Sequence, residues 1–543
     1  MKRRTGLILV GFLLWIVVYP IAIVILESFR DAEGWTVTPL IGFVREPSEW
    51  SALWNSVWIS LASVVSAGVV GIPLAFVFEK LEFPGRRILG ALVALPAVLP
   101  PLVGVIAFLF LYGESGFVAR IITEVLDLDE SPWRLRGAGA ILLVHSYSMY
   151  VYFYLFTRAG LAKIDSSMTE AAQSLGSPGF SIFRRVTLPL LKPQLGAAAL
   201  LVFMTSLGSF SAPYIFGGGF RVMTTQIVTS KLNGDMPAAL IEATWLAAVA
   251  LLGLVMFRRF SGSRSVAVMS KGMAARAATI RQPMARWGAT TIGWLFAAFL
   301  LLPHITLVLV SFVPLNGWST EILPSSYTIA NYITLLHEPE RLRPLWNSIW
   351  MAGVSTILVL TLSLWAAREI VQRKVRLRGT IESLLNVPWA VPGTVLAMAL
   401  ATMFSLTAPW VGRWVLVGTV VILPLAYFVR NIPVASGAVV AGFRQIDPSL
   451  SEAAASLGAS KMRTLWRVTV PLIRPALLAG GALAFATAAG DFVTSVVLYT
   501  FETRPVSIEI LGALRDFDIG MAAAYGVVLM FVSAAAMVVG TRR

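Results

Sequence analysis

Long apolar runs recur along the whole chain and alternate with short polar stretches that carry most of the charge. A continuous apolar run of about 20 residues crosses a bilayer as an α-helix, whereas the strands of a membrane barrel alternate apolar and polar residues. The pattern therefore predicts an all-α polytopic membrane protein. We expect about twelve transmembrane helices, six in each half, over residues 7–27, 54–78, 88–112, 138–160, 194–216, 238–257, 288–312, 346–367, 383–405, 414–436, 476–500 and 521–540.

The composition supports the same class of protein. Of the 543 residues, 57% are hydrophobic and only 13% are charged, and the mean hydropathy is +0.79. Soluble domains carry about 25% charged residues. The chain has no cysteine, which excludes disulfides and thiolate metal sites, and its three histidines lie far apart in sequence. We therefore expect no metal site and no cofactor bound by this chain.

The net charge of +15 comes from loops rather than from a basic soluble domain. Lysine and arginine gather in the N-terminal tail and in every second loop, whereas the alternate loops are richer in aspartate and glutamate. Basic loops of membrane proteins face the cytoplasm. We therefore predict that both termini are cytoplasmic, that the N-terminal apolar run is an uncleaved first span, and that no nucleic acid is bound.

The chain reads as two halves joined by a linker. Small and basic residues fill 261–286, which we interpret as a cytoplasmic connection between a first half, 1–260, and a second half, 287–543. Because each half begins and ends on the same side, we expect parallel repeats related by an axis along the membrane normal. The sequences Asn55-Ser-Val-Trp and Asn347-Ser-Ile-Trp open equivalent spans and support a duplication.

One polar segment occurs twice, as 164–195 and again as 446–477. About half of the aligned positions are identical, including Asp, Glu-Ala-Ala, Ser-Leu-Gly and Arg-Val-Thr, and the offset is 282 residues throughout. Chance repetition in an apolar chain gives runs of leucine and valine, not a fixed polar pattern. Both copies fall in loops that the charge pattern assigns to the cytoplasm.

Each copy predicts a short exposed helix. Asp165 and Ser167 are typical of a helix start, Ser167 and Glu170 have the spacing of a capping box, and Gly176 is typical of a helix end. Two alanines allow close approach of another backbone, and one carboxylate provides a polar anchor. The helix could simply lie on the membrane surface, but two copies with the same polar positions favour docking onto two equivalent partner subunits.

This pattern of Glu-Ala-Ala, three residues, Gly, nine residues and Val-Thr-Leu-Pro resembles the signature loop of permease subunits of binding-protein-dependent ATP-binding-cassette (ABC) importers. The second copy departs only in Val470, where the first has leucine. The resemblance covers the whole chain and implies a fused pair of type I permease halves, similar to iron(III) and thiamine permeases, in a bacterial cytoplasmic (inner) membrane. It implies coupling loops at 161–193 and 443–475, with ATPase-coupling residues Glu170, Ala171, Ala172, Gly176, Glu452, Ala453, Ala454 and Gly458.

The resemblance also implies the partners. These are two copies of an ABC ATPase subunit on the cytoplasmic face and a periplasmic or lipid-anchored solute-binding protein. The chain itself contains no Gly-x-x-x-x-Gly-Lys-Ser/Thr phosphate loop. ATP and Mg²⁺ are therefore expected on the partner subunits, and we predict a transport subunit with no catalytic residues of its own.

Polar residues inside apolar spans are candidates for the substrate path, because an ionisable group there costs about 2.5–3.5 kcal/mol on insertion scales. Asp491 lies well inside the predicted span 476–500, and Ser209 occupies the equivalent place in the first half. We expect these two positions to meet near a central path, with glycines allowing close packing. Arg430, near the end of the predicted span 414–436, could instead reach the cytoplasmic surface. The full set of candidates is Asp491, Ser209, Phe210, Phe492 and Arg430.

The cargo stays open at this point. Iron(III) is the leading expectation from the resemblance, and thiamine, polyamines, phosphonates and sugar phosphates are alternatives of the same transporter class. An ion-coupled secondary transporter would also have two six-span halves, but it predicts several carboxylates within spans, and Asp491 is essentially alone. A membrane scaffold without transport activity would leave the two docking helices unexplained.

Overall fold

The computed structural model describes residues 2–31, 34–94, 96, 100–261, 278–279, 282–315, 317–318, 322–372, 375–405 and 411–541. Most of the predicted linker 261–286 lies outside these residues. The described part is almost entirely helical, and its four strands have two residues each. The chain is an all-α polytopic membrane protein, as the hydropathy pattern predicts.

The first half contains fourteen α-helices in its described residues, together with π-helical turns. Its helices are α1 (Lys2–Leu13), η1 (Leu14–Val18), α2 (Tyr19–Glu27), α3 (Thr38–Arg45), α4 (Pro47–Lys80), α5 (Arg86–Val93), α6 (Pro101–Tyr112), α7 (Phe117–Val125), α8 (Gly137–Leu161), α9 (Ser166–Ser174), α10 (Gly179–Ile182), η3 (Phe183–Thr187), α11 (Leu188–Leu207), α12 (Ser211–Phe216), α13 (Met223–Leu232) and α14 (Met236–Ser261). The strands β1 (Arg30–Asp31) and β2 (Gly34–Trp35) are antiparallel, and β3 (Leu81–Glu82) pairs in parallel with β4 (Ala278–Thr279).

The second half repeats this order of helices. It consists of α15 (Pro283–Val310), α16 (Ala330–His337), α17 (Pro339–Ala367), η4 (Arg368–Gln372), α18 (Arg378–Asn386), η5 (Val387–Trp389), α19 (Gly393–Ser405), α20 (Ile422–Arg444), α21 (Pro448–Ser456), α22 (Lys461–Thr464), η6 (Leu465–Thr469), α23 (Val470–Leu472), α24 (Arg474–Ala489), α25 (Val493–Leu498), α26 (Val506–Arg515) and α27 (Ile519–Thr541). Among the described residues, ten helices are long and apolar enough to span a membrane, or twelve if two bent pairs each count as one span.

The third span of each half is broken, contrary to the straight helices predicted for 88–112 and 383–405. In the second half, the helical segment that ends with η5 and the helix α19 are bent by 102°. In the first half, α5 and α6 are likewise separate helices. Proline accounts for the location of both breaks, because it lacks the N–H that a continuing helix needs: Pro101 begins α6, and Pro392 precedes α19.

The boundaries of the fifth span of each half and of the predicted span 414–436 also differ from the prediction. The fifth spans, predicted as 194–216 and 476–500, end early at Gly208 and Gly490, and short helices α12 and α25 follow. The predicted span 414–436 is wrong at both ends, because α20 runs from Ile422 to Arg444. The residues from 411 to 421 are apolar but form turns.

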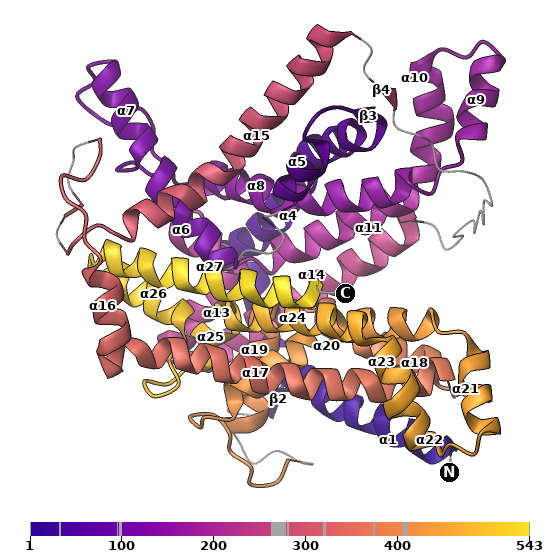
Figure 1. Cartoon of the computed structure of the whole chain (residues 1–543). Helices are drawn as coiled ribbons and strands as arrows, with labels where there is room; N and C mark the ends of the chain where they lie inside the picture. The colour runs from indigo at the N-terminus through magenta and orange to yellow at the C-terminus, as the bar shows by residue number, and fades with distance from the viewer. Residues whose placement is uncertain are drawn as a thin grey trace.

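The two halves exchange their first helices. In the second half's bundle, α2 packs against α19 and α1 against α18, whereas α15 of the second half packs against α5 and α6 of the first. Figure 1 shows the resulting arrangement, with α9–α10 and α21–α22 at one end of the molecule and α7 and α16 at the other. We call the first of these the coupling end, after the coupling loops expected from the sequence, and the second the opposite end.

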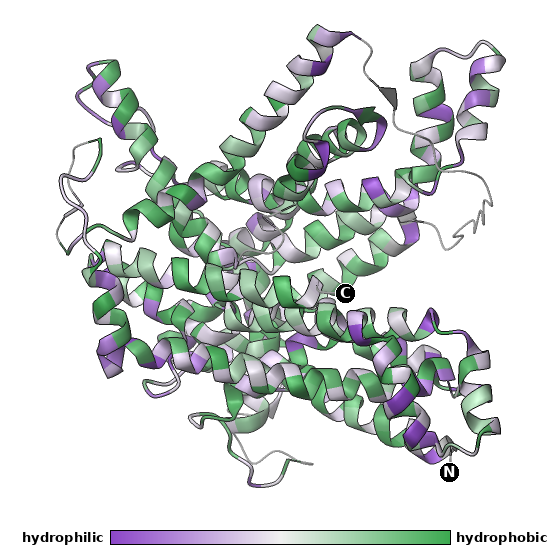
Figure 2. Cartoon of the chain, viewed as in Figure 1, coloured by the Kyte–Doolittle hydropathy of each residue, from purple (hydrophilic) through white to green (hydrophobic). Residues whose placement is uncertain are grey.

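Hydropathy follows this division (Figure 2). The long helices are mostly hydrophobic, and hydrophilic residues gather on the short helices and loops at the two ends. The helices that carry the repeated segments therefore stand clear of the apolar body. This distribution is the one expected of a bundle that spans a bilayer.

Candidate functional site

The two repeated segments form nearly identical exposed helices, α9 and α21. The Oδ1 atom of Asp165 accepts the backbone N–H of Ser167 at 3.0 Å, and Asp447 accepts that of Ser449 at 2.9 Å. These bonds cap the helices, so the helix start is as predicted, but the capping aspartate replaces the predicted capping box of Ser167 and Glu170. The backbone N–H of Ser449 lowers the pKa of the Asp447 carboxyl group.

Both helices end at a glycine in the left-handed conformation. Gly176 has a φ of 77° and Gly458 a φ of 76°. Side chains other than hydrogen are strained there, which explains the glycine in both copies. Neither α9 nor α21 buries a residue within the chain. Their polar and small side chains are therefore available to a partner.

Each helix exposes a glutamate within it and a leucine directly after its last residue. Glu170 and Glu452 are exposed, and neither side chain has a hydrogen bond or ion pair within the described residues. The leucines before the two glycines, Leu175 and Leu457, are 86% and 89% exposed. Because both copies expose a leucine at the same position, these two leucines are candidates for contact with another protein. The sequence analysis did not single out these leucines.

A π-helical turn joins each exposed helix to the fifth span of its half. These turns are η3 and η6, and each buries one threonine, Thr187 or Thr469, to less than 3% exposure. Gln372 donates to the hydroxyl of Thr469 at 3.3 Å. Single π-helical turns are frequent at functional sites. In the first half α10, η3 and α11 follow one another without a break, whereas in the second half a bend of 72° separates α23 from α24.

At the far end of the fifth spans, the two halves meet through equivalent residues. The ring centroids of Phe210 and Phe492 lie 5.2 Å apart, and Tyr214 packs against both rings. The two phenylalanines are 282 residues apart, the offset of the repeated segments. The sequence analysis expected Ser209 and Asp491 themselves to meet. Ser209 instead contacts His145 and Asp491 contacts Arg430, and the neighbouring phenylalanine rings make the contact between the halves.

Each glycine of the fifth span packs against the broken third span of the other half. A Cβ at Gly490 would lie 2.6 Å from Cβ of Pro100, and a Cβ at Gly208 would lie 3.5 Å from Cα of Pro392. The four helix breaks therefore form one layer in the middle of the molecule. We call it the layer of helix breaks.

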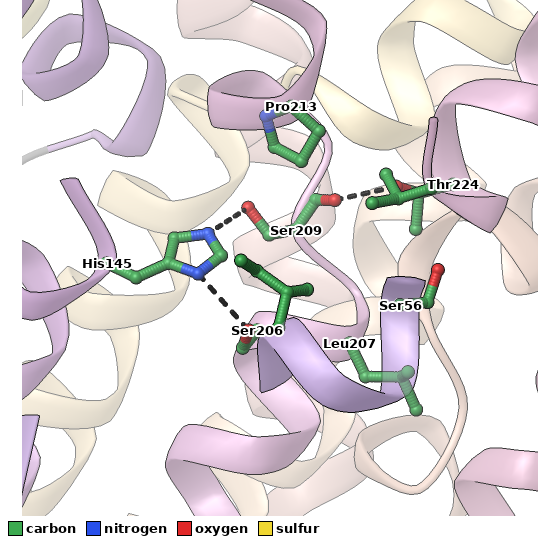
Figure 3. Close-up of a pocket in the computed structure, with 9 residues that line it drawn as sticks. Ser56, His145, Ser206, Leu207, Ser209, Pro213 and Thr224 are labelled. Carbon is green, nitrogen blue, oxygen red and sulfur yellow. Dashed lines mark hydrogen bonds between the residues drawn. The ribbon is translucent and has the colours of Figure 1, made fainter. Parts of the chain in front are cut away.

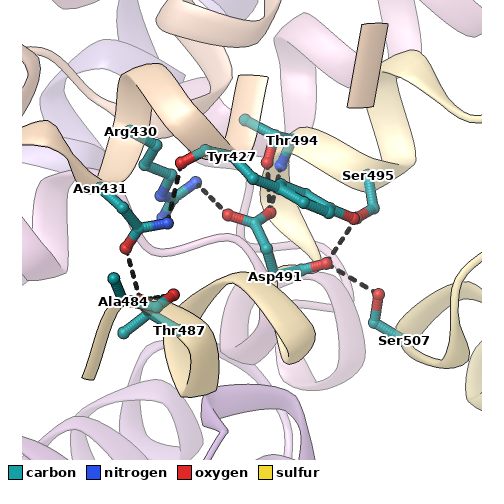
Figure 4. Close-up of polar contacts among 9 residues, drawn as sticks. All are labelled: Tyr427, Arg430, Asn431, Ala484, Thr487, Asp491, Thr494, Ser495 and Ser507. Carbon is teal, nitrogen blue, oxygen red and sulfur yellow. Dashed lines mark hydrogen bonds and ion pairs between the residues drawn. The ribbon is translucent and has the colours of Figure 1, made fainter. Parts of the chain in front are cut away.

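In the second half, this layer contains an ion pair. The Oδ2 atom of Asp491 lies 3.2 Å from Nη1 of Arg430, and Oδ1 accepts the backbone N–H of Thr494 at 2.8 Å (Figure 4). Asp491 therefore lies at a helix break and caps α25, not in the interior of an unbroken span as predicted. Its side chain is only 3% exposed.

The expectation that Arg430 reaches the cytoplasmic surface is wrong. Because α20 begins at Ile422, Arg430 falls in its interior rather than near its end. Its guanidinium lies over Gly393, where a Cβ would be 2.2 Å from Nη1. The break before α19 and the break before α25 are therefore bridged by one arginine.

In the first half, a neutral cluster occupies the same place (Figure 3). His145 is buried; its Nε2 lies 3.0 Å from Oγ of Ser209, and its Nδ1 lies 2.9 Å from Ser63 and 3.2 Å from Ser206. His145 and Ser209 correspond to Tyr427 and Asp491 at the same offset. A small pocket lies beside Ser209 and is lined by Ser56, Ile59, His145, Ser206, Leu207, Ser209, Pro213, Val222 and Thr224.

Hydrogen bonds that recur in both halves hold the layer in place. Thr224 donates to the carbonyl of Ser209 at 2.7 Å, and Ser507 donates to that of Asp491 at 2.8 Å. The Asn-Ser-x-Trp repeats brace the preceding loop in the same way: Asn55 donates to the carbonyl of Arg221, and Asn347 to that of Arg504. The sequence marked these asparagines as signs of duplication but gave no role for them.

The comparison with protein families matches both halves. Residues 67–263 and 359–542 fit the model of the binding-protein-dependent transport system inner membrane component. The chain belongs to this family. It is a fused two-domain permease of the type I ABC importer class and a multi-pass inner membrane protein.

Relatives align over most of this importer permease. A probable ABC transporter permease protein y4fN of Sinorhizobium fredii is 30% identical over 91% of this chain and 87% of its own. The ferric transport system permease protein FbpB of Actinobacillus pleuropneumoniae is 27% identical over 95% and 74%. The thiamine transport system permease protein ThiP of Escherichia coli is 27% identical over 87% of each chain.

Among solved structures, a bacterial ABC transporter involved in alginate import covers 47% of this chain and 95% of its own, with 17% identity and a TM-score of 0.35. The relatives are permease subunits, which agrees with a transport subunit rather than an enzyme.

Proposed function

We propose that this permease forms the membrane path of an iron(III) importer and that α9 and α21 dock onto two copies of an ABC ATPase. The observation that carries the docking proposal is the pair of capped, glycine-terminated helices that bury nothing within their own chain. The docking residues are Glu170, Ala171, Ala172, Gly176, Glu452, Ala453, Ala454 and Gly458. ATP and Mg²⁺ are bound by the ATPase subunits.

The proposed orientation follows from charge. The coupling end carries the basic residues of both repeated segments and therefore faces the cytoplasm, with both termini on that side. The linker 261–286 joins the halves there, and the halves extend over 1–260 and 287–543. The opposite end then faces a periplasmic or lipid-anchored solute-binding protein.

Transport requires the layer of helix breaks to open and close. The rings of Phe210 and Phe492 meet between the halves, and we propose that a solute passes only when they separate. We propose that closure of the two ATPase subunits on ATP moves α9 and α21 together. The π-helical turns carry this movement into the fifth spans, and the halves open toward the binding protein.

Iron(III) as cargo is supported by ferric permease relatives that align with nearly the whole chain. Thiamine is the second candidate, because a thiamine permease aligns over a similar length. Asp491 is neutralised by Arg430 and therefore presents no free carboxylate to a cation. Selection of the cargo would then belong mainly to the binding protein.

Uptake by proteoliposomes tests this function. The chain is reconstituted with its ATPase and its binding protein, and uptake of radiolabelled iron(III) and of radiolabelled thiamine is measured in parallel. We expect iron(III) uptake that needs ATP and the binding protein and that survives ionophores. Thiamine uptake alone would overturn the cargo. Uptake driven by an ion gradient without ATP would overturn the transporter class.

A further inference from the structure

Two carboxyl groups meet at the opposite end of the first half, away from the coupling helices. Glu49 lies in the first turn of α4, and Glu242 lies in α14, which packs against α4 and α13. Gln226 and Ser230, one turn apart on α13, hold one carboxyl group each, which brings the two glutamates side by side. Two ionised carboxylates side by side repel, and the burial of Glu242 to 2% exposure limits the screening of this repulsion by solvent.

Each carboxyl group has one satisfied oxygen and one unsatisfied oxygen. Gln226 donates to Oε1 of Glu49 at 3.1 Å, and Ser230 donates to Oε1 of Glu242 at 2.7 Å. The two Oε2 atoms are buried and accept no hydrogen bond from any described donor. Glu242 is only 2% exposed. A buried carboxylate oxygen without a donor is costly, so this arrangement calls for a bound positive charge.

The second half shows what satisfies the same place there. Glu509 is held by Arg504 at 2.7 Å and by Arg341 at 3.8 Å, and Tyr525 donates to the carbonyl of Arg341. The recurring hydrogen bonds align the two halves here. Asn347 lies 292 residues after Asn55, which pairs Arg341 with Glu49. Ser507 lies 283 residues after Thr224, which pairs Glu509 with Gln226 and Tyr525 with Glu242. The first half thus has a carboxyl group where the second half has an arginine.

The charged neighbours of the pair do not replace that arginine. Arg221, Glu46 and Asp235 act on the two glutamates electrostatically. Arg221 is exposed and forms no ion pair with either glutamate among the described residues, while Asp235 accepts the backbone N–H of Ala238 at 3.1 Å. The balance of charge around the pair therefore remains negative.

We propose that Glu49 and Glu242 form a proton-binding site in which one proton, taken from water, bridges their Oε2 atoms. The proton turns one Oε2 into a hydroxyl group that donates to the other Oε2. The pair then carries a single negative charge. Two carboxylate oxygens are a sparse set of ligands for a metal ion, and the described residues contain no group of three or more His, Asp or Glu side chains suited to one. A proton fits the pair without any further ligand.

Infrared spectroscopy of the full-length chain tests the site. We expect a C=O stretching band of a protonated carboxyl group at neutral pH that disappears on alkaline titration. The band should be absent in Glu242→Gln and in Glu49→Gln, because the remaining single carboxyl group no longer shares a proton. A wild-type spectrum without this band, or a band that persists in both variants, would overturn the proposal.

Thermal unfolding provides a second readout. A native state that holds one more proton than the unfolded state loses up to about tenfold in its folded-to-unfolded ratio for each unit of rising pH. We expect this loss in the wild type and a flatter profile in both glutamine variants. Glu49→Gln, at the half-buried position, keeps the test available if Glu242→Gln does not fold.

Glu509→Gln is the matched control. It removes the buried carboxylate of the equivalent region in the second half, which two arginines already satisfy, so it should lower the melting temperature at every pH and keep the wild-type slope. Equal slopes in the wild type and the Glu242→Gln variant would contradict the proposal. A melting temperature that responds to added Na⁺, Mg²⁺ or Ca²⁺ but not to pH would contradict it too, since a metal ion would then occupy the site.

Discussion

The guanidinium of Arg430 and the carboxylate of Asp491, 3.2 Å apart, connect two helix breaks that belong to different spans of the second half. The first half has no charge at these places, because Ser148 and Ser209 correspond to Arg430 and Asp491. The permease is thus symmetric in its backbone and asymmetric in the chemistry of its central layer. This asymmetry leads to the first prediction.

Arg430→Met should be more damaging than Asp491→Asn. Removing the arginine leaves Asp491 buried and uncompensated, and breaking a buried pair in this way costs about 3–5 kcal/mol. Asparagine at 491 keeps an oxygen for the N–H of Thr494, and Arg430 is one-third exposed and can be hydrated. Melting temperature and ATP-driven uptake should both rank wild type above Asp491→Asn above Arg430→Met.

The double variant Arg430→Met with Asp491→Asn should recover part of the loss. Residues in contact show interaction energies of about 0.5–3 kcal/mol in double-mutant cycles. Strictly additive effects of the two substitutions would mean that the pair contributes nothing through its interaction. The same cycle read in transport rates would show whether the pair acts on stability alone.

Gly490→Ala should disturb the contact between the halves. The added methyl group would lie 2.6 Å from Cβ of Pro100 in the other half, a distance that forces the backbone to shift, and overpacking of this kind costs about 1–3 kcal/mol. Gly437→Ala is the matched control, because nothing lies within 4 Å of its added methyl group. We expect lower melting temperature and uptake for Gly490→Ala only. Equal behaviour of the two variants would contradict the close packing.

Local signals explain which parts of this structure could be predicted. The starts and ends of α9 and α21 depend on a capping aspartate and a left-handed glycine a few residues apart, so the sequence is sufficient there. The number of spans follows from apolar length in the same way. Both predictions use information contained within about 25 residues of chain.

The central layer could not be predicted in this way. Hydropathy treats residues 414–421 as part of a span, although Gly418 has a positive φ angle and the segment is not helical. This misplaced Arg430 by about two helical turns, and its partner Asp491 lies 61 residues further along the chain. Pairing between distant helix breaks depends on how the spans pack, which no local pattern records. Gly490, directly before Asp491, is a local sign of the break. The sequence analysis interprets it only as a glycine that allows close packing.

Replacing both coupling glutamates by arginine should uncouple the permease from ATP. Glu170→Arg with Glu452→Arg reverses the charge on both exposed helices, and the two side chains have no partner within the described residues whose loss could unfold the chain. We expect loss of ATPase copurification and of ATP-driven uptake, with unchanged membrane insertion. Each single variant should lose less. Glu124→Arg changes an exposed glutamate on α7 at the opposite end, and this control variant should copurify with the ATPase as the wild type does. Normal uptake by the double variant would contradict the docking proposal.

The two exposed leucines separate docking from folding most cleanly. Leu175 and Leu457 are more than four-fifths exposed, so Leu175→Ser with Leu457→Ser removes almost no contact within the chain and should leave the melting temperature unchanged. If both leucines enter apolar grooves of the ATPase, each contributes as a buried apolar anchor, worth about 1.5–3 kcal/mol, and the ATPase should dissociate at least tenfold faster from the double variant. Leu232→Ser changes an exposed leucine at the end of α13, outside both repeated segments, and controls for the loss of surface apolar area. Unchanged ATPase affinity in the double variant would leave the glutamates and alanines as the whole docking surface, whereas a lowered melting temperature would show that the leucines pack within the chain in the membrane.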